Sequence, residues 1–358
     1  MKRLGVAMVG CGGVSSGHIR AWCGEKDRAE IVTLVDAVEE FAEERKTEFE
    51  LAASTVGTSY EDVLARDDVD VVDICTPSHQ HAEQVAAALE AGKHVVTEKP
   101  TGYNPEECRK LRWYAQRYPD SKVAVAYSLR YYPLNIRVRQ LVHEGAIGRV
   151  LFGEFSHNHP HDFAQDTEKP SPAPAVPGKK TPLADKGGQY LPSSEMTGAT
   201  HPYDFMRYMF GEVRDVFAFR ADCGVFALMR LESGVIGKAT GGSASKQGLA
   251  TPHVLCIQGT EGTIFTQNEN QYTDKGPVRG YTGYIVTKGE QKPIEVNESD
   301  TSHGDATRTR NFLDAITEDA PLICSLEDSI RTSELLHALW DSHNLEIRVP
   351  VHRVGKSG

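Results

Sequence analysis

Basic charge, long apolar runs and paired cysteines are all scarce in this sequence. Lysine and arginine number 39 against 50 aspartate and glutamate, so the formal net charge is −11. Nucleic acid and anionic membrane surfaces bind basic faces, and no apolar run approaches the roughly 20 residues that cross a bilayer. We therefore expect neither nucleic acid nor a membrane as a partner. A local basic pocket for an anionic small substrate stays open.

The seven cysteines form no CxxC pair and show no paired spacing, which disulfide frameworks and structural zinc sites usually show. Cys11 lies in a glycine turn, and Cys75 and Cys256 lie in apolar, strand-like runs. Such positions are typical of reduced, buried thiols. Because the first residues also enter a strand with no apolar leader core, we expect a cytoplasmic protein without a metal site.

The length of 358 residues exceeds the roughly 250 to 300 residues that a single core usually holds. It predicts two domains, over residues 1–127 and 128–358. In the first, helical patterns at 38–51 and 81–91 alternate with apolar runs at 4–9, 31–35, 69–75, 94–97 and 122–126. This alternation predicts an α/β, Rossmann-type, doubly wound parallel sheet.

The second predicted domain has a different pattern. Residues 153–188 are rich in Pro, Gly, His and Lys, which indicates a long functional or mobile loop. A helical stretch at 202–210 precedes strand-like segments at 213–221, 224–231, 234–241, 253–259 and 262–267. Their close spacing predicts an α/β domain with a large, open, mostly antiparallel sheet. Helices are expected over 307–317 and 326–343, where they could pack back on the first domain.

The turn after the first strand carries a dinucleotide-binding pattern, formed by Gly10, Cys11, Gly12, Gly13, Val14 and Ser15. The first glycine permits a tight turn, the second lets the backbone approach a pyrophosphate, and Ser15 is small enough for the third position. Asp36 follows at the end of the second strand, where a carboxylate binds an adenosine ribose 2′-OH and repels a 2′-phosphate. The pattern predicts NAD rather than NADP, although neighbouring basic residues can restore NADP binding. The alternative is that the glycines only turn the chain and Asp36 caps a helix.

Further short motifs follow this turn in a fixed order. They are His18, CTPS at 75–78 with His81, AGKHV at 91–95, EKP at 98–100, RYYP at 130–133, GAIGRV at 145–150, HPYD at 201–204 and FLDAI at 312–316. Together they resemble the Gfo/Idh/MocA oxidoreductases, the family of glucose–fructose oxidoreductase and inositol dehydrogenase. The resemblance covers nearly the whole chain and is more specific than any single motif.

The resemblance implies a Rossmann domain followed by an α/β domain whose open sheet carries the substrate site. That sheet usually also forms an oligomer interface, so a homo-dimer or homo-tetramer is expected. Lys99 would lie beside the nicotinamide, and His201 would project from a helix of the second domain. The residues expected to bind the cofactor are Gly10, Cys11, Gly12, Gly13, Val14, Asp36, Thr76, Pro77, Ser78, His81, Glu98 and Lys99.

Oxidation of a secondary alcohol gives Lys99 and His201 catalytic roles. The reaction needs a base for the hydroxyl proton and a positive or hydrogen-bonding group where oxygen gains negative charge. His201, with an ordinary pKa near ~6.5, suits the base, and Lys99 can hold the hydroxyl. The alternatives are a surface lysine at a strand end and a histidine bonded to its neighbours at a helix start.

The sequence departs from the family pattern before His201. Family dehydrogenases commonly carry an acid four residues before this histidine, where Thr197 stands here. The nearest acid, Glu195, lies six residues before His201, and that spacing does not share a helical face as a spacing of four does. We expect Glu195 and Thr197 near the substrate, with Glu195 reaching it only if the approach to the helix is not helical.

Other polar side chains are candidates for substrate contact. His157 and His159 would share one face of an extended segment, where they bind substrate, line the strand or, with further ligands, bind a metal. Tyr127 and Arg130 either face the substrate or pack at the domain junction. The lysine pair 179–180 is either solvated or meets an acidic substrate.

These observations favour an NAD(P)-dependent oxidoreductase that transfers a hydride between nicotinamide and a hydroxyl carbon of a sugar, sugar acid or cyclitol. One alternative is an NAD-dependent glycosidase, in which transient oxidation, elimination, hydration and re-reduction release an aglycone without net NADH. Another is a non-catalytic, nucleotide-sensing regulator. The presence of Lys99 and His201 argues against the last, because fold alone decides nothing about chemistry.

Overall fold

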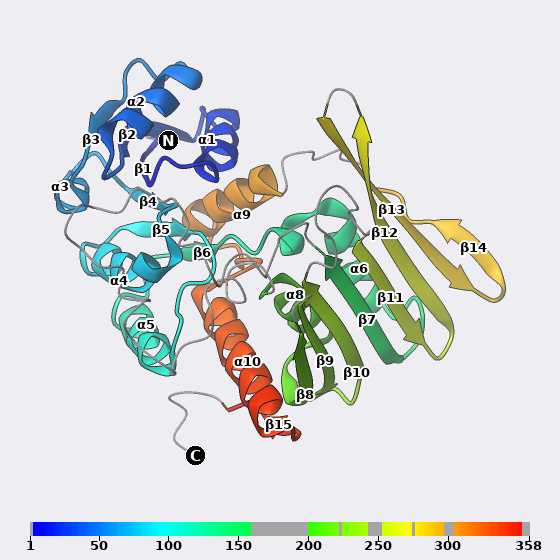
Figure 1. Ribbon diagram of the computed structural model, residues 1–358. Helices are drawn as coiled ribbons and strands as arrows, with labels where there is room; N and C mark the ends of the chain where they lie inside the picture. Colours follow the sequence, from blue (N-terminus) through cyan, green and yellow to red (C-terminus); the bar gives the residue numbers. More distant parts are fainter. Residues whose placement is uncertain are drawn as a thin grey trace. The chain divides into compact units, whose positions relative to one another are not determined.

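A computed structural model of the protein describes residues 3–158, 200–221, 224–242, 253–273, 276–296 and 304–352 (Figure 1). The described residues form two compact units. One unit comprises Met1–Ile136 with Val296–Arg331, and the other comprises Arg137–Glu295 with Thr332–Arg353. Each unit contains one sheet. Among the described helices, none has both the length and the apolar character that crossing a membrane requires.

The first unit is built on a six-stranded sheet with the order β3-β2-β1-β4-β5-β6. Every pair of neighbouring strands is parallel, which confirms the predicted doubly wound sheet. The strands are β1 (Leu4–Val9), β2 (Ala29–Val35), β3 (Thr55–Gly57), β4 (Val71–Ile74), β5 (His94–Thr97) and β6 (Val123–Val125). The edge strand β3 was not predicted, because its sequence TVG contains only one large apolar residue and so forms no apolar run.

Helices of the first unit cover both faces of this sheet. Alternate residues of β1 enter different cores: Ala7 and Val9 pack in one cluster, and Val6 and Met8 pack in the other, as the two-residue period of a strand requires. The helical elements are α1 (Ser15–Gly24), α2 (Glu39–Glu48), α3 (Tyr60–Leu64), η1 (Ser78–Gln80), α4 (His81–Glu90), α5 (Pro105–Arg117), η2 (Ser128–Tyr131) and α9 (Asp305–Thr317).

Two late segments of the chain complete these cores. Phe312 and Leu313 of α9 pack in one cluster, and Leu326 and Ile330, at the start of α10 (Leu326–Leu345), pack in the other. The ring of Phe312 is fully buried and meets Trp22 edge-on, with ring centroids 6.3 Å apart. Residues beyond position 300 therefore contribute to both cores of the first unit.

The second unit is built on a nine-stranded sheet with the order β14-β13-β12-β11-β7-β10-β9-β8-β15. Only β7 and β10 pair in parallel among its described strands, which confirms the predicted mostly antiparallel sheet. The strands are β7 (Val150–Asn158), β8 (Val213–Ala221), β9 (Gly224–Leu231), β10 (Ile236–Gly242), β11 (His253–Gly259), β12 (Gly262–Thr273), β13 (Gly276–Thr287), β14 (Glu290–Pro293) and β15 (Val349–Pro350). Helix α6 (Pro133–His143) precedes β7.

Residues 153–158 correct one expectation. They were assigned to a long loop because they begin the stretch 153–188, which is rich in Pro, Gly, His and Lys, but they belong to β7 in the middle of the sheet. The glycine has a packing reason, since a Cβ on Gly153 would lie 2.4 Å from the ring of Phe210. Helix α8 (Thr200–Phe210) therefore packs closely on β7, with Phe155 and Phe205 rings 4.5 Å apart.

Replacing Phe312 with alanine tests the contribution of α9 to the first unit. Loss of this buried ring should lower the free energy of unfolding by about 3 to 5 kcal/mol, measured by urea unfolding followed by circular dichroism. The matched control is Phe41→Ala on α2, where the ring is 37% exposed and the loss should stay within about 0.5 kcal/mol. Equal losses in the two variants would contradict this account of the core.

Candidate functional site

The glycine turn joins β1 to α1 and can accept a pyrophosphate. Gly10 has a φ of +89°, and a Cβ there would lie 2.7 Å from backbone atoms of Cys75 and Thr76, so only glycine fits. Cβ atoms on Gly12 and Gly13 would have nothing within 4 Å. Helix α1 begins at Ser15, so its free N–H groups and positive dipole end lie at this open space.

Asp36 lies next to the turn at the end of β2. Its Oδ2 accepts a hydrogen bond from the Cys11 N–H at 2.7 Å, and its Oδ1 accepts one from the Val38 N–H at 2.9 Å. Each carboxylate oxygen can accept a further bond, so the half-buried group can also bind a ribose hydroxyl. Arg45 is the nearby basic residue, but it pairs with Glu48 and donates to the Gly12 carbonyl at 3.3 Å.

The loop after β4 is tied to its surroundings by side chains that the sequence assigned to the cofactor. Thr76 donates to Gln84 at 2.5 Å, and Ser78 is hydrogen-bonded to Tyr103. His81 is buried, with its Nδ1 2.8 Å from the Pro100 carbonyl and its Nε2 2.8 Å from the Thr76 carbonyl. Burial lowers the pKa of His81. The ring therefore joins this loop to the segment that carries Lys99.

Glu98 and Lys99 follow β5 directly and are half-buried. Burial lowers the pKa of the Lys99 ammonium, and the Glu98 carboxylate opposes that shift only in part. The pKa of Glu98 lies well below its usual range, because the hydrogen bond from His18 and the charge of Lys99 outweigh the effect of burial. The site thus holds a fixed carboxylate beside an amine that gives up its proton more readily than a solvated lysine.

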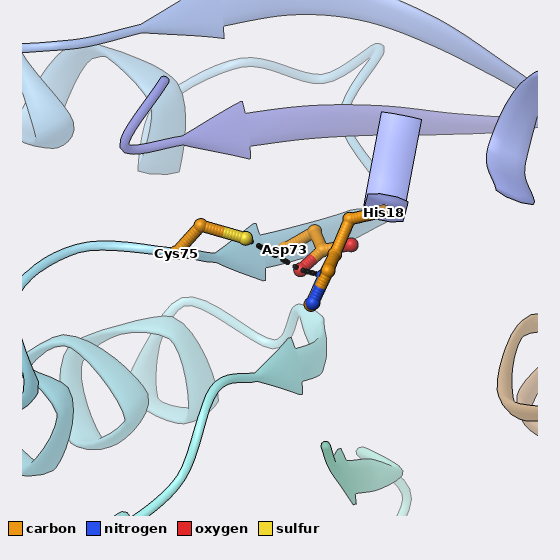
Figure 2. Close-up of side chains that lie close together, drawn as sticks. All are labelled: His18, Asp73 and Cys75. Carbon is orange, nitrogen blue, oxygen red and sulfur yellow. Dashed lines mark hydrogen bonds and ion pairs between the residues drawn. The ribbon is translucent and has the colours of Figure 1, made fainter. Parts of the chain in front are cut away.

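The buried side chains of His18 and Asp73 form a cluster with the half-buried Cys75 (Figure 2). Their potential ligand atoms lie within 4.8 Å of one another, but their contacts form a hydrogen-bond network. Asp73 is 2.8 Å from the His18 ring and accepts a 3.7 Å bond from Cys75. Burial raises the pKa of the Cys75 thiol to about 12, whereas metal binding requires a thiolate.

A row of buried histidines occupies one face of the second unit. The ring of His157 on β7 lies 5.3 Å from that of His201 on α8 and 4.1 Å from that of His253 on β11. Gly241 of β10, which has no side chain, pairs with His157 on the other side. The row places three imidazoles beside a position without a side chain, an arrangement suited to binding a small polar molecule.

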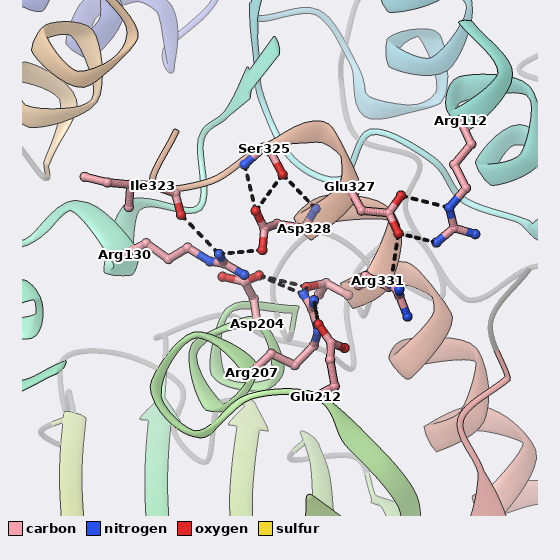
Figure 3. Close-up of polar contacts among 11 residues, drawn as sticks. Arg112, Arg130, Asp204, Arg207, Glu212, Ile323, Ser325, Glu327, Asp328 and Arg331 are labelled. Atoms are coloured by element: carbon pink, nitrogen blue, oxygen red, sulfur yellow. Dashed lines mark hydrogen bonds and ion pairs between the residues drawn. The ribbon is translucent and has the colours of Figure 1, made fainter. Parts of the chain in front are cut away.

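Asp204 and Arg207 anchor the helix that carries His201 (Figure 3). Thr332 donates to Asp204 Oδ1 at 2.7 Å and accepts from Arg207 at 2.8 Å, and Arg207 also pairs with Glu212 at 2.6 Å. Asp204 is therefore engaged in holding α8. It does not replace the acid that the family pattern places four residues before His201.

Tyr127 and Arg130 pack inside the first unit. Tyr127 joins a core cluster with Val125, Tyr131 and Cys324. Arg130 is buried, pairs with Asp328 at 3.0 Å and donates to the Ile323 carbonyl at 3.2 Å (Figure 3).

Several sequence candidates lie outside the described residues. They are His159, Glu195, Thr197 and the lysine pair 179–180. Two residues of the clusters were missed. Asp73 interrupts an apolar strand, and His253 alternates with the buried Leu255 and Ile257. The sequence could have indicated both residues, because a polar side chain on the buried face of a strand needs a hydrogen-bond partner.

Comparison with known proteins identifies the family. Residues 4–127 match the model of the oxidoreductase family with an NAD-binding Rossmann fold, and residues 194–351 match the model of its C-terminal alpha/beta domain. The chain belongs to the Gfo/Idh/MocA family.

Known family members resemble the chain over most or half of its length. Levoglucosan dehydrogenase of Pseudarthrobacter phenanthrenivorans is 25% identical over 409 residues, covering 99% of the chain and 100% of the relative. Inositol 2-dehydrogenase of Salmonella typhimurium is 26% identical over 181 residues, covering 51% and 50%. A solved levoglucosan dehydrogenase in complex with NADH and levoglucosan superposes with a TM-score of 0.77 at 22% identity, covering 98% and 100%.

As a Gfo/Idh/MocA protein, the chain is an NAD-binding oxidoreductase. The open space at Gly12 and Gly13 and the acceptors of Asp36 fit this cofactor. When bound, NAD supplies a hydride acceptor, and its reduced form supplies a hydride donor.

Replacing Asp36 with alanine tests how this family member selects NAD. The variant should bind NAD about 10-fold more weakly, because the ribose hydroxyl loses its acceptor, and should no longer repel the 2′-phosphate of NADP. Titration calorimetry with both nucleotides measures the two affinities. Glu39→Ala, which removes an exposed acid in the first turn of α2, should change neither. Unchanged discrimination in Asp36→Ala would show that other residues select the cofactor.

Proposed function

We propose that this oxidoreductase transfers a hydride between NAD and a hydroxyl carbon of a sugar, sugar acid or cyclitol. The observation that carries the proposal is the half-buried Lys99, with its lowered pKa, directly after β5 in a chain of this family. Full-length similarity to a levoglucosan dehydrogenase and partial similarity to an inositol 2-dehydrogenase support a carbohydrate-like substrate.

The proposed chemistry assigns one task to each of two side chains. During oxidation, His201 takes the proton of the substrate hydroxyl. Lys99 donates a hydrogen bond to the same oxygen while negative charge develops on it and the carbonyl forms. A lowered lysine pKa suits this task, because the amine can also exchange a proton near neutral pH.

We assign substrate binding in the second unit to the histidine row. His157 and His253 lie on the sheet face that carries α8, with their rings 4.1 Å apart and the ring of His157 5.3 Å from that of His201. His159, Glu195 and Thr197 remain predicted substrate contacts outside the described residues. Tyr127 and Arg130 are better assigned to packing, given their contacts.

We further propose that the protein is a homo-dimer or homo-tetramer formed through the open face of the nine-stranded sheet. The face opposite α8 exposes large apolar side chains on four strands, and exposed apolar surface can mark an interaction site. The exposed fractions are 56% for Phe219, 38% for Phe226, 53% for Leu228, 41% for Ile236 and 36% for Phe265.

A cytoplasmic location is proposed from cysteine chemistry. Six cysteines in the described ranges are free thiols, at positions 11, 23, 75, 108, 256 and 324. Free thiols are the usual state in a reducing compartment.

The catalytic assignment is tested with NAD and a panel of sugars, sugar acids, cyclitols and glycosides. NADH absorbance and aglycone release are followed in the same wells. A free sugar or cyclitol should yield NADH, and kcat should fall about 100- to 10,000-fold in Lys99→Met and in His201→Asn. The surface changes Lys110→Met and His143→Asn are the matched controls and should leave kcat unchanged.

Two outcomes would contradict the assignment. Aglycone release without net NADH would identify an NAD-dependent glycosidase. Full activity in Lys99→Met or His201→Asn would remove that residue from the proposed chemistry.

The oligomer interface is tested with Leu228→Asp. A charge in the middle of the apolar face should convert the oligomer to a monomer, measured by sedimentation velocity at micromolar concentration. Trp113→Asp is the matched control, because Trp113 is 57% exposed on α5 of the first unit. An oligomer that survives Leu228→Asp would place the interface elsewhere.

A further inference from the structure

The buried carboxylate of Asp73 lies in the middle of the parallel sheet of the first unit. It stands on β4, has no exposed surface and would be strongly destabilising without partners. Trp22 of α1 donates its indole N–H to Oδ2 at 2.7 Å. Since an indole N–H only donates, this bond fixes the orientation of the carboxylate and leaves Oδ1 facing the ring of His18.

The imidazole of His18 bridges two carboxylates. Its Nδ1 is 2.8 Å from Asp73 Oδ1, and its Nε2 is 3.3 Å from Glu98 Oε1. Ionised carboxylates only accept hydrogen bonds, so both ring nitrogens must carry a proton. Burial and the Arg308 guanidinium lower the pKa of His18, but the charge and hydrogen bond of Asp73 outweigh them and raise it well above its ordinary value.

The second carboxylate oxygen of Glu98 connects these hydrogen bonds to Lys99. Glu98 Oε2 accepts a 3.1 Å hydrogen bond from the Lys99 backbone N–H. Contacts therefore run from Trp22 through Asp73, His18 and Glu98 to the backbone of Lys99. Because Trp22 and His18 both belong to α1, the helix that starts at the cofactor turn also holds this backbone.

We propose that His18 is a positioning residue, a buried imidazolium that orients Glu98 and through it the Lys99 segment. His18 itself is 1% exposed. This role rests on the proposed function of Lys99. The bond between His18 and Glu98 is nevertheless defined by contacts within the first unit alone.

Other ionisable groups surround this ring and bear on its protonation. Arg308 of α9 is buried but pairs with Asp305 at 2.6 Å. His81 on α4 is bonded to backbone carbonyls. The groups that face the network are Asp73 on β4, Cys75 after β4, His81 on α4, Glu98 and Lys99 after β5, and Asp305 and Arg308 on α9.

The first test uses the unmodified protein and needs no substrate. Nitrogen-15 spectra of the histidine rings, assigned with His18→Gln, should show His18 doubly protonated at pH 8. The ordinary histidine pKa is about 6.5. A neutral His18 ring at pH 8 would overturn the proposal whatever the enzymatic activity.

The second test compares His18→Gln with His94→Gln. Glutamine at position 18 is uncharged and has both of its N–H donors on one nitrogen, so it cannot reproduce the two separate ring donors of His18. His94 stands at the opposite end of β5 from Lys99 and accepts one backbone hydrogen bond, from Lys122 at 3.1 Å. With a substrate found active in the panel, kcat should fall about 10- to 100-fold in His18→Gln, because small displacements of a catalytic group have effects of this size. The KM of the sugar should change by no more than about threefold.

The pH profile separates positioning from general damage. His18→Gln removes a buried positive charge next to Glu98, so the apparent pKa of Lys99 in the pH profile of kcat/KM should rise. His94→Gln should leave this apparent pKa unchanged. Equal losses in both variants, or an unmoved limb with normal kcat in His18→Gln, would overturn the proposal. If the unmodified protein oxidised nothing in the panel, the proposed function would fail while the nitrogen-15 result still decided the state of His18.

Discussion

The structure of the first unit depends on pairing one buried negative charge. Asp73 lies inside a parallel sheet, where its carboxylate has no exposed surface, and an unpaired charge there would not be tolerated. Its partners Trp22 and His18 belong to α1, whose first turn follows the glycine turn. The position of α1 on the sheet, the open space at Gly12 and Gly13, and the Glu98–Lys99 segment are consequently linked by one set of contacts.

In the second unit, the position of helix α8 depends on glycines in the strands against which it packs. Gly153 and Gly237 leave room for Phe210 and Met206, so α8 packs closely against β7 and β10. This packing places the ring of His201 next to that of His157. The residues that would contact a sugar thus depend on packing positions that carry no side chain.

Much of the fold could be predicted because its strands are apolar and regularly spaced. The bounds of β1, β5, β8, β9 and β11 were those expected. Strand β7 was not predicted, because its glycine and histidine resemble a loop until α8 is known to cover them. Lys99 and His201 were predicted as catalytic residues from family motifs, because the spacing of nearby residues alone does not indicate them.

The partners of the site residues were harder to predict. Nothing in the local sequence indicates that Arg130 meets Asp328, almost 200 residues later, or that His18 meets Asp73 and Glu98. Such pairs depend on the order of strands and on helices that return late in the chain. A polar residue within an apolar strand predicts that a partner exists, but not which residue it is.

Transfer of a labelled hydride tests the central claim most directly. A sugar or cyclitol that is active in the panel, deuterated at each ring carbon in turn, would be incubated with NAD, and the nicotinamide product analysed by mass spectrometry. The proposed oxidation predicts reduced nicotinamide carrying deuterium from a single carbon, and no transfer in Lys99→Met. Reduced nicotinamide without deuterium, or turnover of the sugar with the cofactor unchanged, would contradict direct hydride transfer as the function of this protein.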